Sequence, residues 1–217
     1  MKYVTMDIGI KKSKVALFND CLDMIHYHQV DNTYSSIEES LDVLIDFITR
    51  FDYEYDKVSL GYCLSDSINP KVIQKYISEK SNKPVIIEDS NNIAALVESN
   101  RGAGKMSDSV YYLTLADTIN GVLVHQNNIV HSKVLQKDIS KHTELSILQI
   151  LEKDICLVNN TCPIDTLIVD GPLLKKYSTL FSSLQTILSK HCELQKVFMT
   201  TSHFKENAVL FGAITMS

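Results

Sequence analysis

A cluster of carboxylate and amide side chains, Glu88 to Asn92, is the part of the sequence best suited to contact a ligand. It follows a β-branched apolar run, Val85 to Ile87, which predicts a buried strand. The next run, Ile93 to Val97, predicts a helix for which the polar cluster supplies N-cap residues. A second predicted strand, 110–115, ends in Ala116-Asp117-Thr118. Ligands of open α/β sheets usually bind at the carboxyl ends of the strands, so this edge is the candidate site.

Glycine is scarce in this chain. Seven glycines in 217 residues are roughly 3%, against about 7% in ordinary proteins. Folds that hold phosphate on backbone N–H groups use glycines, because the chain must approach the anion closely. Few glycines are therefore present for such a site. They are Gly9, Gly61, Gly102, Gly104, Gly121, Gly171 and Gly212.

The composition is that of a globular protein that lacks a nucleic-acid-binding face. Hydrophobic residues make up 45% and charged residues 22% of the chain, and the net charge is −5 with the signs interspersed. Apolar runs stay below the ~18–20 residues of a membrane-spanning helix. The N-terminus lacks the apolar core of a signal peptide. We therefore expect a cytoplasmic protein with neither a nucleic-acid nor a membrane partner.

The five cysteines are odd in number and scattered, which disfavours a disulfide framework and favours a reducing compartment. Cys156 and Cys162 are too far apart in sequence for a common zinc-binding pair. We therefore expect neither disulfides nor zinc.

The order of predicted elements indicates a duplicated fold. Alternating residues predict three antiparallel strands, and Ser36 with Glu39 forms a capping box for a helix with an apolar face from Ile37 to Phe51. A strand, a helix opened by Pro70 and the Val85 strand follow. The predicted strands of this half are 3–9, 14–18, 24–30, 58–64 and 85–87.

The second half repeats this order loosely. Two halves of one topology predict an α/β fold with lobes at 1–108 and 109–217, a cleft between them, and a last helix that packs back on the first lobe. The predicted elements are strands 110–115, 122–126 and 129–134, helix 143–156, strand 166–169, helix 173–190, strand 196–200 and helix 206–216.

The segments between Glu88 and Val122 resemble the ROK family of sugar kinases and sugar-responsive repressors. That family has a strand, E-N-D-A-N-A-A-A-L, a helix, G-A-G-K-G, and a strand ending L-T-L-G-T-G-I-G-G-G. This chain has Glu88–Leu96, Gly102–Met106 and Leu113–Val122 in the same order without a gap. The resemblance implies an actin-like ATPase fold, related to ribonuclease H, with a sugar and Mg-ATP as ligands of an active member.

The resemblance implies a catalytic base at the aspartate of E-N-D-A-N, where this chain has Ser90. A serine hydroxyl has too high a pKa to act as that base. Asp89 is one residue earlier, and successive residues at a strand end point to opposite sides. Three roles stay open for this pair: capping the helix, binding a ligand, or, for Asp89, acting as a relocated base. The implied sugar-binding residues here are Asp89 and Asn92.

The family's first phosphate turn, D-I-G-G-T-K, corresponds to residues 7–12. Asp7, Gly9 and Lys12 are retained, but the bulky Ile10 replaces the second glycine. Asp7 would contact a magnesium ion or, as an aspartate at a hairpin turn, bond only local backbone.

The family's second phosphate loop corresponds to residues 116–122, and its adenosine-side G-G-G turn corresponds to residues 169–172. They give Asp117, Thr118, Gly121 and Gly171 as the remaining implied nucleotide-binding residues. The carboxylate of Asp117 would repel a triphosphate unless a metal ion intervened.

The segments that match the family's sugar-binding motifs depart from the family pattern as much as the phosphate loops do. The E-x-G-H motif has its nearest match at His142, whose alternative is a solvated histidine before a helix. The family's long sugar loop is compressed into Gly61 to Pro70, and its C-x-C-G-x-x-G-C zinc cluster is absent from the sequence.

The leading hypothesis is a degenerate ROK homologue without phosphotransfer activity that acts as a ligand sensor or protein-interaction module. One alternative is an active ATP-dependent hexose kinase with Asp89 as base. Another is a regulatory partner that dimerises with an active paralogue. The expected partners are a small-molecule sugar and a second copy of the chain or a paralogue.

Overall fold

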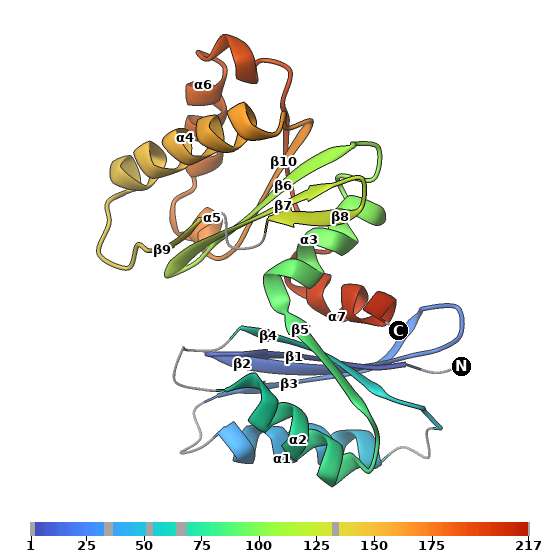
Figure 1. Cartoon of the computed structure of the whole chain (residues 1–217). Helices are drawn as coiled ribbons and strands as arrows, with labels where there is room; N and C mark the ends of the chain where they lie inside the picture. The colour runs from blue at the N-terminus through green and yellow to red at the C-terminus, as the bar shows by residue number, and fades with distance from the viewer. Residues whose placement is uncertain (1–2, 33–36, 51–53, 64–68, 132–134, 217) are drawn as a thin grey trace. The chain divides into compact units, whose positions relative to one another are not determined.

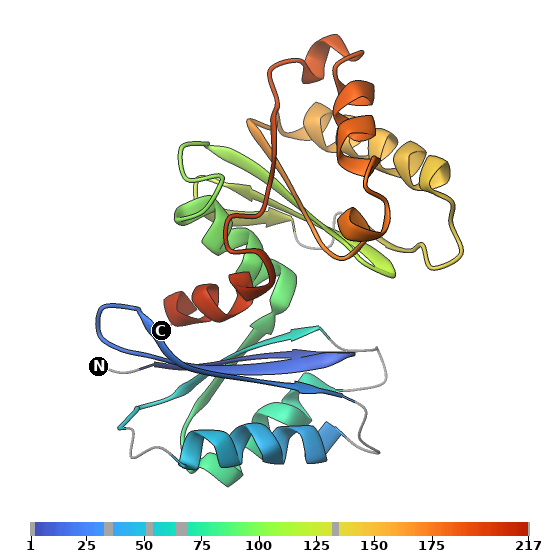
Figure 2. The same cartoon turned by 180° about the vertical axis from the view of Figure 1, so that it is seen from behind.

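The computed structural model describes residues 3–32, 37–50, 54–63, 69–131 and 135–216. The chain divides into two compact units, Met1–Ile93 with Val209–Ser217, and Ala94–Ala208. Each unit has a mixed β-sheet with helices packed on it (Figures 1 and 2). Compared with lobes at 1–108 and 109–217, residues 94–108 group with the second unit and residues 209–217 with the first.

The first unit contains a five-stranded sheet in the order β3-β2-β1-β4-β5. β1 pairs antiparallel with β2 and parallel with β4, β2 pairs antiparallel with β3, and β4 pairs parallel with β5. The three-strand antiparallel prediction for the N-terminus is therefore confirmed. The strands are β1 (Tyr3–Gly9), β2 (Lys12–Phe18), β3 (Met24–Asp31), β4 (Val58–Cys63) and β5 (Val85–Asp89).

Helices cover both faces of this sheet. Helices α1 (Ile37–Thr49) and α2 (Pro70–Ser81) lie on one face, and α7 (Ala208–Ala213) lies on the other (Figure 1). The alternation of β2 explains both layers, since Val15 and Leu17 pack in the core under α1 and α2, whereas Ala16 and Phe18 pack with Leu210 and Ile214.

The start of α2 is described in full, and that of α1 only from Ile37 onward. The Asn69 side chain caps α2 by accepting a hydrogen bond from the N–H of Lys71, and Pro70 stands in its first turn. The predicted capping box of α1 depends on Ser36, which lies outside the described residues.

The second unit repeats the topology. Its strand order is β11-β10-β6-β7-β8, with β9 also paired to β7. Central β6 pairs antiparallel with β7 and parallel with β10, as β1 does with β2 and β4. The duplicated α/β fold is therefore confirmed. The strands are β6 (Ser109–Leu115), β7 (Thr118–His125), β8 (Asn128–His131), β9 (Gln136–Asp138), β10 (Thr166–Asp170) and β11 (Phe198–Thr201).

Two long helices, α4 (Glu144–Thr161) and α6 (Leu180–Leu188), cover one face of the second sheet (Figure 1). Thr143 caps α4 by accepting a hydrogen bond from the N–H of Ser146. Buried leucines of both helices, Leu151 and Leu184 among them, pack in one core with β6 and β10. Helix α3 (Ser90–Asn100) follows β5, and the short α5 (Leu173–Lys176) follows β10.

Several predicted elements were wrong in their bounds, and the helix predicted at 143–156 is longer, since α4 ends at Thr161. The predicted helix 173–190 is two helices, because Tyr177 has an extended backbone, with φ −117° and ψ 91°. The predicted helix 206–216 is α7 flanked by 3₁₀ turns at Lys205–Asn207 and Ile214–Met216. The loop expected at Thr118 to Gly121 is the start of β7, because these residues pair with β6 and Thr118 to Asn120 also pair with β9. Of the predicted strand 129–134, residues 132–134 lie outside the described part.

Within the described residues, no helix combines the length and apolar character that a membrane crossing requires.

Candidate functional site

A hydrogen bond between Ser90 and Asp7 marks the centre of the candidate site in the first unit. Ser90 is the first residue of α3, and its Oγ donates to Oδ1 of Asp7 in β1 over 3.1 Å. Ser90 is buried. The two residues are 83 positions apart in sequence, and the parallel pairing of β1, β4 and β5 brings them together. The hydroxyl at the family's base position is thus a donor to a carboxylate.

The charge on Asp7 is set by opposing effects. Burial raises the pKa of Asp7, while the positive charge of Lys14 and the hydrogen bond from Ser90 lower it. Lys14 is buried and stands directly opposite Asp7 in the β1–β2 pair, where side chains share a face. Sequence analysis placed Lys14 in a strand but did not single it out, because its importance depends on the register of the pair.

Asp89 has a different role from Ser90. Its Oδ1 accepts hydrogen bonds from the backbone N–H of Asn91 at 2.8 Å and from the Asn91 side chain at 3.2 Å. Asp89, the last residue of β5, therefore caps α3. Of the capping roles considered for this pair, Asp89 has one, while the Ser90 hydroxyl is directed to Asp7.

Further polar side chains line the same sheet edge. Glu88 Oε1 accepts hydrogen bonds from the N–H of Asp89 at 2.8 Å and from the Asn92 side chain at 3.0 Å. Tyr62 stands opposite Asp89 in the β4–β5 pair, and its pKa is raised by burial and by the charges of Asp89 and Glu88. A Cβ on the neighbouring Gly61 would collide with Val209 and crowd Ser90, so glycine lets α3 and α7 approach β4 here.

The first predicted phosphate turn is held by the residue that follows β3. The Asn32 side chain donates to the carbonyl of Gly9 at 2.5 Å, and its backbone N–H donates to the carbonyl of Lys11 at 2.8 Å. Lys12 is exposed and lies 3.7 Å from the Asp31 carboxylate. Asn32, which sequence analysis missed, thus fixes this turn from a distance in sequence that no local pattern reveals.

The two glycines predicted to bind nucleotide in the second unit have their N–H groups engaged. Gly121 N–H donates to the Leu135 carbonyl at 2.9 Å, and the side chain of Tyr111 fills the space where a Cβ would lie. Gly171 has φ +116°, and a Cβ there would collide with the backbone of Leu115. Its N–H donates to Oδ1 of Asp170 at 2.7 Å. Packing and backbone conformation account for both glycines.

Asp117, Thr118 and His142 are brought near one another by Ile139. The N–H of Ile139 donates to the carbonyl of Asp117 at 2.8 Å, and its own carbonyl accepts from the N–H of His142 at 2.9 Å. Asp117 is exposed and His142 is half-buried. Thr118 pairs with Asp138, whose pKa is lowered by hydrogen bonds from Ser140.

The predicted site residues divide between the two units. Asp7, Gly9, Lys12, Asp89, Ser90 and Asn92 belong to the first, and Asp117, Thr118, Gly121, His142 and Gly171 belong to the second. Within the first unit, the structure brings Asp7 and Ser90 into contact at one sheet edge.

A buried carboxylate of α3, Glu98, organises part of the second unit. Its side chain accepts hydrogen bonds from the N–H of Ala103 at 2.8 Å, the hydroxyl of Ser202 at 2.5 Å and the N–H of Phe204 at 2.9 Å. These bonds tie the start of the unit to its last residues. No local pattern in the sequence distinguishes Glu98 from an ordinary helical glutamate, because its partners are distant in sequence.

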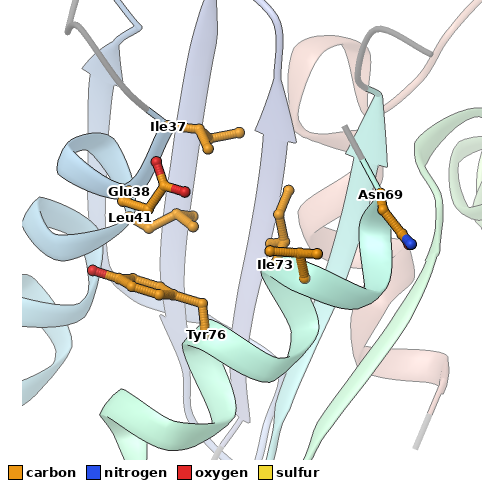
Figure 3. A pocket seen from close by; sticks show the side chains of 7 residues that line it. Ile37, Glu38, Leu41, Asn69, Ile73 and Tyr76 are labelled. Carbon is orange, nitrogen blue, oxygen red and sulfur yellow. The ribbon is translucent and has the colours of Figure 1, made fainter. Parts of the chain in front are cut away.

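A pocket of about 280 Å³ lies between α1 and α2, on the face of the first sheet that these two helices cover (Figure 3). Apolar side chains such as Leu41 and Ile73 line it, together with Tyr76. None of the predicted site residues contributes to it.

Comparison with known proteins gives a sugar kinase and a sugar-related repressor as similar sequences. No protein-family profile matches the chain. It is 29% identical to an N-acetyl-D-glucosamine kinase of Mannheimia succiniciproducens over 142 residues, which are 58% of this chain and 46% of that kinase. It is 30% identical to the xylose repressor of Bacillus spizizenii over 122 residues, 47% of this chain and 31% of the repressor. The matches thus span less than half of either relative.

The similar solved structures share the fold over nearly the whole chain. One is an inorganic polyphosphate/ATP-glucomannokinase from an Arthrobacter species, with a TM-score of 0.77, 14% identity, and coverage of 99% of this chain and 97% of the other. Another is a ROK family glucokinase from Streptomyces griseus in complex with glucose and AMPPNP, with a TM-score of 0.75, 12% identity, and coverage of 100% and 99%. The predicted fold class is confirmed by these structures.

Proposed function

The chain resembles the ROK family in sequence and has its fold, and from this premise we propose that it binds a sugar without transferring phosphate to it. It would act as a ligand sensor or protein-interaction module. The observation that carries the proposal is the hydrogen bond from Ser90 to Asp7, at the position where a ROK kinase has its catalytic aspartate.

The chemistry of phosphoryl transfer requires a group that accepts the proton of the attacking hydroxyl. Ser90 offers a hydroxyl that is already a donor to Asp7. Asp89 offers a carboxylate, but its Oδ1 accepts the N–H at the start of α3. Use of that oxygen as a base would remove a helix cap, at a cost of about 0.5–2 kcal/mol. The direction of the Ser90 hydrogen bond supports a site without a base at the family's position, and the helix cap opposes a second role for Oδ1 of Asp89.

The residues predicted to bind nucleotide support the same proposal. The N–H groups of Gly121 and Gly171 are bonded within the chain, so they are not directed at an anion. In the first unit, the charge of Lys14 acts on Asp7. An ammonium group beside this carboxylate opposes the binding of a magnesium ion to it.

The polar edge of β4, β5 and α3 retains groups that suit a sugar. Carboxylates accept hydrogen bonds from hydroxyls, and amides both donate and accept. Asp89 and Asn92 are half-buried at this edge, beside the exposed Glu88. The names of the kinase and the repressor, and the glucose bound to the Streptomyces griseus glucokinase, suggest N-acetyl-D-glucosamine, xylose and glucose as the first sugars to test.

The test is a phosphotransfer assay with Mg-ATP and each sugar, together with calorimetry of sugar binding. We expect wild type to show no turnover above background and at least one sugar to bind. Asn92→Ala should weaken that binding, and Lys153→Ala, at an exposed position of α4 outside the predicted site, serves as the control. Turnover by wild type that disappears in Asp89→Asn would overturn the proposal and identify an active kinase with a relocated base.

A further inference from the structure

A cluster of three side chains of different chemistry lies in the second unit, apart from the residues discussed above. Cys156 is on α4, His191 precedes a 3₁₀ turn, η1 (Cys192–Leu194), and Glu193 is within that turn. One ligand atom from each residue lies within 4.8 Å of the other two. Cys156 and His191 are half-buried and Glu193 is exposed, so the cluster opens to solvent.

A fourth residue fixes the orientation of the histidine. His191 Nε2 lies 2.7 Å from Oε1 of Glu152, which stands one turn before Cys156 on α4. An ionised carboxylate only accepts hydrogen bonds, so Nε2 of a neutral His191 carries the proton. Nδ1 then has the lone pair, and it faces the Cys156 Sγ at 3.9 Å and the Glu193 Oε1 at 3.9 Å.

Two of the three separations are close to those of a tetrahedral metal site, and the third, between the Cys156 sulfur and the Glu193 carboxylate, is within 4.8 Å. With bonds of about 2.3 Å to sulfur and about 2.0–2.2 Å to nitrogen and oxygen, neighbouring ligand atoms of tetrahedral zinc are about 3.3–3.6 Å apart. The two distances of 3.9 Å are a few tenths of an ångström longer, which small side-chain rotations would close. A thiol, an imidazole and a carboxylate are the three ligand types that zinc takes from proteins.

We propose that Cys156, His191 and Glu193 bind a zinc ion, with Glu152 as the positioning residue that orients His191. A carboxylate that accepts a hydrogen bond from the second nitrogen of a metal-binding histidine is the usual support of such a site. Water fills the fourth position, as in zinc sites with three protein ligands.

The local charge favours a cation. The carboxylates of Glu152 and Glu193 both approach the His191 ring, so they place negative charge at the cluster. A bound zinc ion would offset these negative charges and hold the sulfur as a thiolate.

Short sequence spacing does not reveal this cluster. Cys156 and His191 are 35 residues apart, and the fold brings them together by packing α4 against η1. The site is separate from the cysteine-rich segment of the ROK family, which the sequence lacks. The expectation of no zinc rested on that segment and on the spacing of Cys156 and Cys162.

The competing explanation is a purely structural link, in which the His191–Glu152 hydrogen bond joins α4 to η1 and no metal binds. The test uses the full chain, freed of metal with a chelator and then titrated with Zn²⁺ or Co²⁺. We expect one ion per chain, a raised melting temperature with zinc, and a sulfur-to-cobalt charge-transfer band with cobalt.

Variants assign the ligands. Cys156→Ser should abolish the charge-transfer band, and His191→Ala should weaken binding by at least tenfold. Glu152→Gln should keep the band but weaken affinity about 10–100-fold, as expected of a group that acts through the histidine. Cys192→Ser is the matched control, because this exposed cysteine is next to His191 but outside the cluster.

Each variant is compared with wild type without metal by circular dichroism, so that a folding defect is separated from a lost ligand. Absence of stoichiometric binding by folded wild type would overturn the proposal. So would binding that is unchanged in Cys156→Ser, or a band that is lost in Cys192→Ser instead.

Discussion

The two units have the same strand order but use their polar side chains differently. In the first unit, Asp89, Asn92 and Glu88 are half-buried or exposed at the sheet edge. In the second, Tyr111 bonds Asp154 and Glu98 bonds Ser202 in the interior. The duplicated topology therefore preserves the scaffold, while these polar groups lie at the sheet edge in one copy and in the interior in the other.

The two units also share a feature, which is the way the turn between their central antiparallel strands is held. In each unit, a residue after an edge strand bonds the turn between the two central antiparallel strands: Asn32 bonds Gly9 and Lys11, and Ile139 bonds Asp117. These turns correspond to phosphate loops of ROK kinases. In both units, hydrogen bonds within the chain close this turn.

The largest expected loss in the free energy of unfolding is caused by a substitution of Glu98 in the second unit. Glu98→Ala removes three hydrogen bonds, which the Ser202 hydroxyl and the N–H groups of Ala103 and Phe204 donate to the carboxylate. We expect a loss of about 4 kcal/mol in the free energy of unfolding, measured by urea denaturation. Glu79→Ala is the control, because Glu79 is exposed and 3.7 Å from Lys75, and its loss should cost less than about 0.5 kcal/mol. A loss below about 1 kcal/mol for Glu98→Ala would contradict the role given to this carboxylate.

The second-largest loss of stability is expected at the buried pair of Tyr111 and Asp154. The Tyr111 hydroxyl donates a hydrogen bond to Oδ2 of Asp154 at 2.5 Å. Tyr111→Phe should cost about 1–3 kcal/mol at neutral pH, because a buried carboxylate loses its donor. Tyr27→Phe, at an exposed tyrosine of β3, is the control and should cost less.

The pH dependence of this loss has a definite sign. Burial raises the pKa of Asp154, and the hydrogen bond from Tyr111 lowers it. Without Tyr111 the folded-state pKa rises further above the unfolded value, so the ionised form destabilises the fold and protonation relieves the cost. The loss should therefore be complete at neutral pH and shrink as the pH falls through the raised pKa of Asp154. A loss that grows in acid would contradict this account.

The smallest loss in the free energy of unfolding is expected for a substitution at the candidate site of the first unit. Ser90→Ala removes the hydrogen bond to Asp7 but leaves the favourable charge of Lys14. The free energy of unfolding should fall by about 0.5–1.5 kcal/mol, and the pKa of Asp7 should rise further. Urea denaturation and an NMR titration of the Asp7 carboxyl measure the two effects. A loss larger than that of Tyr111→Phe would reverse the contrast between the units.

The elements were largely predictable because local patterns determine them. The apolar alternation of β1 and the β-branched run of β5 identify these strands, and Asn69 with Pro70 marks the start of α2. The predicted helix 173–190 failed at Tyr177, whose extended backbone ends α5 without a proline or glycine nearby to indicate it.

The site was predictable only where chemistry is local. The capping role of Asp89 follows from its place before a helix, and the structure has that bond. The contact of Ser90 with Asp7 joins residues 83 positions apart, so it depends on strand order. Gly121 looked like part of a phosphate loop, whereas the size of Tyr111 across the β6–β7 pair explains why glycine stands there.

The central claim, that the chain binds a sugar but lacks phosphotransfer, is tested most directly by thermal melting with each ligand in turn. A ligand that binds only the folded state at 100 times its Kd adds about 2.7 kcal/mol to stability. We predict that at least one of N-acetyl-D-glucosamine, xylose and glucose raises the melting temperature, while Mg-ATP leaves it unchanged with or without that sugar. A rise with Mg-ATP, accompanied by formation of a sugar phosphate, would contradict the account.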